Sequence, residues 1–235
     1  MDEWIELIYI FIMCFVLYIL FICYLENSKY KKSSYGKQKK ESFWKTISDT
    51  GAKGEYRTSL ALDKSSFYKK MIFNCYLPKN QNDTTEIDII MLSTKGIFVI
   101  ENKNYNGWIF GDEKSKNWCQ TLHGQKNFFY NPIKQNSSHI KALLKLTNEN
   151  QNNIFSLIVF NKATLKKVTY ESNDNLTVIN LAQLQNILKK HDKKRDIYSN
   201  DEVDSLYNKL LPYTEITIEK KEEHIRRIKS KQMNT

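Results

Sequence analysis

The pattern of apolar positions along the chain is uneven, with one long apolar segment first and many short apolar runs after it. Ile5 to Leu25 is almost wholly apolar, with Glu6 as its one charge, and about 20 such residues allow a helix to cross a bilayer. The acidic start, Met1-Asp2-Glu3, lacks the positive charge of a signal peptide, and no small-residue cleavage site follows. We therefore expect a transmembrane helix; the alternative is a helix of a hydrophobic core.

Beyond this segment, short apolar runs alternate with amphipathic stretches. Runs rich in β-branched and aromatic residues, too short for helices, predict strands at residues 71–77, 87–92, 97–100, 108–111, 154–160 and 176–180. Pro78 and a polar loop are expected to end the first of them. Helical spacing of apolar residues predicts helices at residues 55–62, 137–146, 181–190 and 200–211. This alternation indicates an α/β domain.

Two of these strands form the centre of the pattern, a hairpin that is apolar on both faces and is therefore predicted to be buried. Thr94-Lys95-Gly96 suits its turn, because glycine tolerates positive φ. A turn centred on Thr94-Lys95 pairs Asp88 with Glu101, on the face that also carries Lys103. Two acids and a lysine are thus expected to converge, unless a bulge at the glycine shifts the register.

The chain is strongly basic, with a net charge of +10 and a sequence pI near 9.2. Such a charge favours phosphate-rich partners, either nucleic acid or an anionic membrane surface. Six lysines lie between Lys29 and Lys40, directly after the apolar segment. The positive-inside rule places this flank and everything after it in the cytoplasm, where the lysines can contact anionic lipid.

Other signals narrow the possible chemistry. The four cysteines show no CxxC spacing, which argues against a zinc site or a disulfide framework and fits a reducing compartment. No glycine-rich phosphate loop occurs, so ATP or GTP use is not indicated. Histidine as a residue type suits a catalytic base near neutral pH, which makes His123 and His139 candidates. A polar loop explains the first better, and a surface or packing position in a helix explains the second better. Trp118 is interpreted as a hydrophobic lid on the sheet, with a base-stacking platform as the alternative.

The hairpin cluster has the composition of a site for a hard cation. Mg²⁺ prefers oxygen ligands and keeps several waters, so Asp88, Glu101 and the backbone carbonyl of Asn102 suffice to hold it against a substrate phosphate. Lys103 can orient or help deprotonate the attacking water, or stabilise charge that develops on the phosphorus centre. A structural salt-bridge group at a strand end would show the same pattern.

The motifs follow one another in a specific order. They are Gly54-Glu55, Glu86-Ile-Asp88, Gly96 to Asn104, Gly107 to Gly111, Trp118 and Asn131-Pro-Ile-Lys-Gln135. In this order they resemble the nuclease-related domain, NERD, which is similar to the PD-(D/E)xK nuclease superfamily. The resemblance covers about residues 50–160 and extends to the trailing elements near residue 212. It implies a restriction-endonuclease-like mixed sheet core flanked by helices.

The resemblance also implies a role for each matching residue. Asp88 and Glu101 fall on the metal-binding acids, and Lys103 falls on the catalytic lysine. Glu55 falls on the acid of the first helix and is a further candidate metal ligand. Gln135 falls on the glutamine that supports the site from the following helix. The implied cofactor is Mg²⁺ or Mn²⁺.

The chain is therefore divided into four parts. These are a transmembrane anchor (1–26), a basic cytoplasmic tether (27–48), a NERD-like nuclease domain (49–213) and a charged C-terminal helix or tail (214–235). The last part is either a solvated helix or a nucleic-acid contact.

Two functions remain open at this point. The leading hypothesis is a metal-dependent nuclease, a hydrolase of DNA phosphodiesters, anchored in the cell membrane with its domain in the cytoplasm. The alternative is a non-catalytic scaffold that binds nucleic acid or protein at the membrane. A cation between Asp88 and Glu101 with an open water position favours the enzyme. A direct ion pair of Lys103 that fills the same space favours the scaffold.

Overall fold

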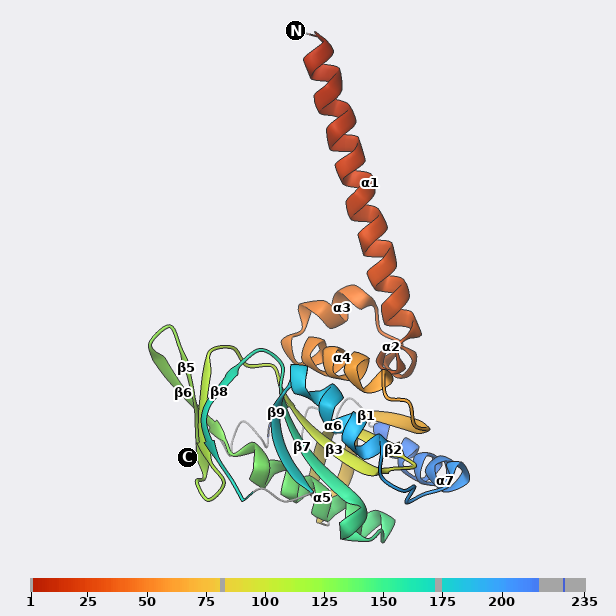
Figure 1. Cartoon of the computed structure of the whole chain (residues 1–235), viewed down its shortest axis with the longest axis vertical. Coiled ribbons are helices and arrows are strands. Elements are labelled where there is room, and N and C mark those ends of the chain that lie inside the picture. Colours follow the sequence, from red (N-terminus) through yellow and green to blue (C-terminus); the bar gives the residue numbers. More distant parts are fainter. Residues whose placement is uncertain (1, 81–82, 172–174, 216–225, 227–235) are drawn as a thin grey trace.

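The computed structural model describes residues 2–80, 83–171, 175–215 and 226. Helices flank two sheets, and one long helix projects from the rest (Figure 1). The helices are α1 (Asp2–Lys32), α2 (Ser34–Lys39), α3 (Phe43–Ser48), α4 (Thr50–Asp63), α5 (Pro132–Thr147), α6 (Leu184–Asp192) and α7 (Asn200–Leu210). The strands are β1 (Lys69–Asn80), β2 (Asp83–Ser93), β3 (Gly96–Lys103), β4 (Trp108–Asp112), β5 (Asn117–Leu122), β6 (Gln125–Tyr130), β7 (Ile154–Phe160), β8 (Thr164–Thr169) and β9 (Leu176–Asn180). Short 3₁₀ helices are η1 (Gln151–Asn153), η2 (Leu181–Gln183) and η3 (Leu211–Thr214).

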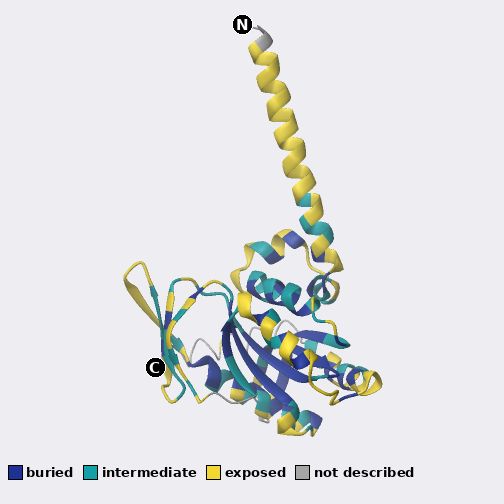
Figure 2. Cartoon of the chain, viewed as in Figure 1, coloured by how far each residue is buried: buried dark blue, intermediate teal, exposed yellow. Residues whose placement is uncertain are grey.

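The projecting helix α1 is apolar and exposed along most of its length (Figure 2). Its stretch Trp4–Lys32 has a mean hydropathy of 2.8 in its most apolar window, and none of that window is buried. The apolar part of the helix is therefore not part of the protein core, and it is long and apolar enough to cross a membrane.

The segment after the apolar helix is folded onto the domain, whereas the sequence predicted a tether over residues 27–48. Ser33 caps α2 through its side chain, and Ser42 caps α3 in the same way. Tyr30, Tyr35 and Phe43 are at most 4% exposed and belong to the core cluster that contains α4. The three rings bury apolar area, and this stabilises the packing of the segment on the domain. The lysines around the rings make the segment basic overall, so its composition did not indicate this packing.

The first sheet has the order β1-β2-β3-β7-β9 and is mixed, because β1, β2 and β3 are antiparallel while β3, β7 and β9 are parallel. The predicted register of the central hairpin is confirmed at Leu92–Ile97 and Ile90–Val99, and Gly96 takes φ 124° in the turn. Strand β1 continues through Pro78 instead of ending before it. An edge strand tolerates proline, because one side of its main chain has no partner strand.

Helices cover both faces of this sheet (Figure 1). Side chains of α4 and α6 form a core cluster with one face. Side chains of α5 and α7 form a second cluster with the opposite face. The predicted helices are thus confirmed, with α5 starting at Pro132 and α7 ending before Pro212. Glu55 lies in the second turn of α4, as expected.

A second sheet of order β6-β5-β4-β8 lies beside the first. Only the β4 part of it was predicted, because β6 and β8 are largely exposed and half or more of their residues are polar. Ile109 and Trp118 of this sheet pack against Ile158 and Phe160 of β7. A charged C-terminal helix or tail was predicted over residues 214–235. Apart from residues 214, 215 and 226, this segment lies outside the described residues.

Candidate functional site

Asp88 lies where β2 and β3 separate. The paired part of these strands ends with Ile89 opposite Ile100, so the expected pair of Asp88 with Glu101 lies beyond the ladder. Oδ2 of Asp88 instead accepts a hydrogen bond from the backbone N–H of Asn102 at 2.8 Å. The carboxylate thus takes the place of a main-chain acceptor at the point where the strands diverge.

Glu101 is 1% exposed and is bound from two sides. Its Oε1 lies 2.7 Å from Nζ of Lys103, and its Oε2 lies 3.1 Å from Nε2 of His139. Lys103 also donates a hydrogen bond to Oε1 of Gln135 at 3.1 Å. Gln135 and His139 are four residues apart on α5, so one helix face supplies both contacts. The other ring nitrogen of His139 lies 2.7 Å from the Thr85 hydroxyl.

The charges of Glu101 and Lys103 stabilise each other. Burial disfavours ionisation of Glu101, but the charge of Lys103 and the hydrogen bond with His139 outweigh it and lower the pKa of Glu101. Burial likewise disfavours the lysine cation, but Glu101 and Asp88 outweigh it and raise the pKa of Lys103. Lys103 is therefore an ammonium ion at neutral pH.

The surroundings of the other acids of the cluster, Asp88 and Glu55, oppose their ionisation. Burial, followed by the charges of Glu101 and Glu55, raises the pKa of Asp88 well above its usual value. Burial also raises the pKa of Glu55 and outweighs the opposing charge of Lys39. Full ionisation of Asp88, Glu55 and Glu101 would place more negative charge in the cluster than Lys103 balances.

Glu55 reaches this cluster through residues that the sequence did not indicate. Nδ2 of Asn74 donates both to Glu55 at 3.2 Å and to Glu86 at 3.0 Å. The hydroxyl of Tyr76 donates to Glu86 at 2.7 Å. Asn74 has φ 51°, a conformation in which asparagine is several-fold enriched. Such a residue in a strand is a weak signal of special geometry, visible only once the backbone is known.

Helix α2 also contributes to the site, although it lies outside the expected domain. The hydroxyl of Tyr35 donates to Oε2 of Glu55 at 3.2 Å. The side-chain amide of Gln38 forms two hydrogen bonds with the main chain of Phe73, at 3.0 and 3.1 Å. These bonds hold the edge of β1 directly before Asn74.

The donors of the cluster suit a hard divalent cation. Asp88 and Glu101 provide carboxylate oxygens, and a bound cation would favour the ionised form of Asp88. The N–H and C=O of one strand residue point to the same edge, so the carbonyl of Asn102 points into the gap that holds Asp88. Among the described residues, no three His, Cys, Asp or Glu side chains gather closely enough to form a metal centre by themselves. A cation here would need the carbonyl, water and substrate as further ligands.

Other candidates lie elsewhere. Trp118 is 1% exposed and stacks on Phe160 with an interplanar angle of 6°, so it is a buried packing residue and offers no surface to a base. His123 lies in the turn between β5 and β6 and is exposed. His139, for which a surface or a packing position was expected, is buried, and its contact with Glu101 makes it part of the cluster. It could have been found by placing it one turn after Gln135 on the same helix face.

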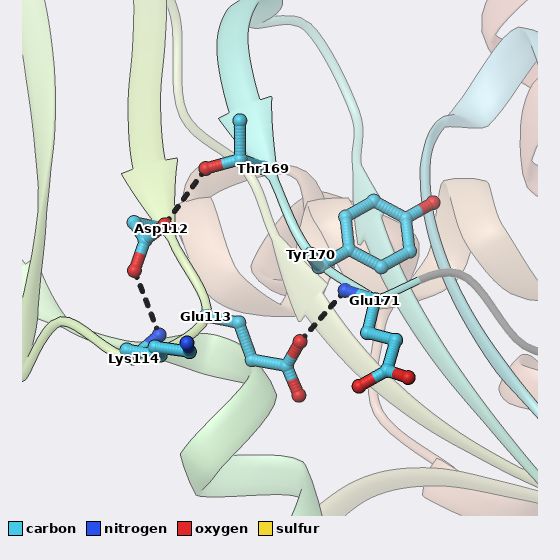
Figure 3. A pocket seen from close by; sticks show the side chains of 6 residues that line it. All are labelled: Asp112, Glu113, Lys114, Thr169, Tyr170 and Glu171. Carbon is cyan, nitrogen blue, oxygen red and sulfur yellow. Dashed lines mark hydrogen bonds between the residues drawn. The ribbon is translucent and has the colours of Figure 1, made fainter.

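A surface hollow of about 570 Å³ lies at the end of β4 and β8 (Figure 3). Its lining residues are Asp112, Glu113, Lys114, Thr169, Tyr170 and Glu171. The Thr169 hydroxyl donates to Asp112 at 2.8 Å, and the backbone N–H of Glu171 donates to Glu113 at 2.8 Å. Three acids at this surface repel phosphate, and none of the cluster residues lines the hollow, so we do not assign it as the site.

The fold and the cluster together define a mixed α/β domain with buried acids and a lysine at the point where two central strands separate. The chain belongs to the nuclease-related domain family, whose model matches residues 50–161. It is 36% identical over 151 residues to an uncharacterized protein of Bacillus anthracis, and this alignment spans 64% of the present chain and 68% of that relative. No solved structure matches the chain.

Proposed function

We propose that the chain is a membrane-anchored, metal-dependent nuclease that hydrolyses phosphodiester bonds of DNA. One observation carries the proposal: Asp88, Glu101 and Lys103 converge where β2 and β3 separate, with Gln135 bound to the lysine. Membership of a family named as nuclease-related supports the reaction class. The basic charge of the chain supports a phosphate-rich substrate.

Each residue has a role that its contacts support. Asp88, Glu101 and the carbonyl of Asn102 would hold Mg²⁺ or Mn²⁺, which supplies Lewis-acid activation of water and of a phosphate oxygen when it is bound. Lys103 is cationic, so it orients the water and stabilises charge in the transition state rather than acting as the base. Gln135 holds the ammonium group of Lys103 in place, and Glu55 adds negative charge from α4.

The proposed location follows from α1 and its flank. Ile5 to Leu25 spans the cell membrane once, and the lysines from Lys29 to Lys40 stay on the cytoplasmic side. The same lysines can contact anionic lipid headgroups. The catalytic cluster then faces the cytoplasm close to the membrane, because α2 connects the anchor directly to Glu55.

The test is DNA cleavage by the full-length chain in lipid nanodiscs. We expect Mg²⁺-dependent cutting by the wild type, and its loss in Asp88→Ala and in Lys103→Ala. Lys145→Ala removes an exposed lysine of the same helix that carries Gln135 and is the matched control; it should cut like the wild type. Equal cutting by all four proteins would identify a contaminating nuclease and contradict the proposal.

The second candidate function is a non-catalytic scaffold at the membrane, and the ion pair between Lys103 and Glu101 at 2.7 Å favours it. In that case the pair is structural, and Mg²⁺ has no effect on the protein. Titration of full-length wild type with Mg²⁺ separates the two functions. A Mg²⁺-dependent rise in melting temperature that Asp88→Ala abolishes supports the enzyme, whereas an unchanged melting temperature supports the scaffold.

A further inference from the structure

The second sheet has one buried face and one open face. Ile109 of β4 and Trp118 of β5 point into the cluster between the two sheets. Successive side chains of a strand point to opposite faces, so Trp108 and Phe110 of β4 point outward. Trp108 is 51% exposed. Figure 2 shows β6 as largely exposed, whereas β5 is mostly of intermediate exposure.

Strand β6 extends the same open face with more aromatic rings. Its residue Phe128 pairs with Cys119, which is itself the partner of Phe110. Directly paired residues share a face, so Phe128 lies on the open side, and Tyr130 follows two residues later. Phe128 is 66% exposed and Tyr130 is 48% exposed. Three large aromatic side chains on one open sheet face are unusual for a surface that binds nothing.

Strand β8 brings positive charge to this face. Leu165 and Val168 of β8 pack against the inner cluster, and the register with β4 shifts by one residue between them. This irregularity leaves both Lys166 and Lys167 on the open side. Nζ of Lys166 lies 4.9 Å from the centre of the Trp108 ring, a cation–π distance.

The composition of the open face fits unstacked bases better than a lipid surface. Single-stranded nucleic acid binds to platforms that combine aromatic rings with lysine or arginine. A surface that inserts into lipid separates its Trp, Phe and Leu side chains from its lysines, whereas here Nζ of Lys166 lies over the Trp108 ring itself. The acids of this sheet gather at the opposite end of β4, around the hollow of Figure 3.

The open face also adjoins the catalytic cluster. Strand β4 begins five residues after Lys103. The carbonyl of Lys103 accepts a hydrogen bond from the N–H of Asn161 at 3.0 Å, and the carbonyl of Gly107 accepts one from Thr164 at 2.8 Å. The starts of β4 and β8 are thus tied to the strand ends that carry the cluster, and Trp108 with its contact to Lys166 lies toward that end.

We infer that the open face of the second sheet, formed by Trp108, Phe110, Phe128, Tyr130, Lys166 and Lys167, binds single-stranded nucleic acid by base stacking. One consequence of this binding, delivery of the strand to Lys103, rests on the proposed nuclease function. The binding itself requires no cleavage.

The test measures binding of a fluorescent oligothymidylate to the full-length chain in zwitterionic nanodiscs with EDTA present. The oligonucleotide has about 20 nucleotides, which exceeds the site size of most single-strand-binding folds. Trp108→Ala and Phe128→Ala should each weaken binding roughly tenfold, because each removes one stacking surface. Exchange of Lys166 and Lys167 for Gln should reduce the slope of the logarithm of the binding constant against the logarithm of salt concentration by about 1.4. Each phosphate contact contributes about 0.7 to this slope.

Trp44→Ala is the matched control, because Trp44 is 60% exposed on α3 and lies outside the open face. Its binding should equal that of the wild type. Near-ultraviolet circular dichroism of each variant checks the fold. In peptide mapping, the bound oligonucleotide should also slow maleimide labelling of Cys119, which lies between Phe110 and Phe128.

The inference is wrong if Trp108→Ala and Phe128→Ala bind like the wild type, or if Trp44→Ala weakens binding equally. It is also wrong if a duplex of the same length binds with the same dependence on Trp108. Binding to anionic vesicles that needs Trp108, without binding of the oligonucleotide, would make the face a lipid contact instead. Binding without any Mg²⁺-dependent cutting would contradict the proposed function and leave this inference standing.

Discussion

At the residue scale, the cluster is notable for its balance of charge. Glu55, Glu86, Asp88 and Glu101 are linked by Coulombic interactions or shared hydrogen bonds, and Lys103 is the cation bound directly to one of them. Glu55 and Asp88 are placed here although burial and the charges of neighbouring acids raise their pKa values. Such an arrangement costs stability and is typical of functional sites.

The first prediction concerns Asp88→Asn. The folded-state pKa of Asp88 is raised, so its ionisation destabilises the fold, and the loss grows as pH rises from the unfolded pKa through the folded one. Asparagine keeps an oxygen that can accept from Asn102 but carries no charge. We expect a higher melting temperature than wild type at pH 8 without divalent ions, and a difference that vanishes below about pH 4.

The same variant tests the cation. Added Mg²⁺ should raise the melting temperature of the wild type more than that of Asp88→Asn, because the variant has lost a charged ligand. Thermal unfolding followed by circular dichroism measures both effects. A less stable Asp88→Asn at pH 8 would contradict the assigned charge balance.

The second prediction concerns Gly54 of α4. A Cβ atom there would lie 2.7 Å from the side-chain amides of Asn102 and Asn161. Gly54→Ala should therefore destabilise the protein by about 1–3 kcal/mol through overpacking, although alanine is the better helix former. Cleavage should fall as well, since Asn102 is displaced. Denaturant unfolding measures the change.

Gly51 of the same helix provides the control for this substitution. A Cβ atom at Gly51 would meet only a carboxylate oxygen of Asp49, at 3.3 Å. Gly51→Ala should be neutral or stabilise by up to about 1 kcal/mol. Equal effects at the two glycines would show that helix propensity, rather than the close approach of α4 to β3, determines the effect of the substitution.

At the element scale, α2 joins the projecting helix to the cluster. Tyr35 binds Glu55 from one side of this short helix, and Gln38 binds the main chain of β1 at Phe73. The rings of Tyr30 and Tyr35 are at most 2% exposed. A change in the position of α1 relative to the domain would therefore move the side chains that contact Glu55 and the strand next to Asn74.

The third prediction compares two truncated forms of the chain. A form that begins at Glu41 loses Tyr30, Tyr35 and Gln38, and it should unfold at a lower temperature, since each buried tyrosine contributes about 1.5–3 kcal/mol. A form that begins at Glu26 loses the apolar helix but keeps these contacts. It should melt close to the full-length domain. Equal melting temperatures of the two forms would mean that α2 does not stabilise the site.

At the scale of the whole molecule, the proposed location of the domain rests on the exposed apolar helix and the basic flank. The fourth prediction is that protease added to inside-out membrane vesicles digests the domain, whereas right-side-out vesicles protect it. Extraction with alkaline carbonate should leave the chain in the membrane pellet. Digestion in right-side-out vesicles would place the cluster on the outer side and exclude a cytoplasmic substrate.

Much of the fold was predictable from the sequence because its cause is local. The hairpin register followed from the placement of Gly96 and from apolar side chains on both faces. Helix α5 followed from its apolar spacing and from Pro132 at its start. The convergence of Asp88, Glu101, Lys103 and Gln135 followed from the same register together with the family motifs.

What only the tertiary structure decided depends on contacts between distant segments. The sequence determined the apolar helix, the hairpin and the identities of the acid and lysine residues, because spacing and composition carry that information. It could not show that Tyr35 and Gln38 fold back onto Glu55 and β1, since lysines surround them. It could not show the second sheet, whose outer strands are stabilised by pairing and by burial of Trp118 on Phe160 rather than by apolar runs of their own. Charge balance in the cluster was likewise decided by tertiary structure, because a pKa depends on burial and on neighbours that the chain order does not reveal.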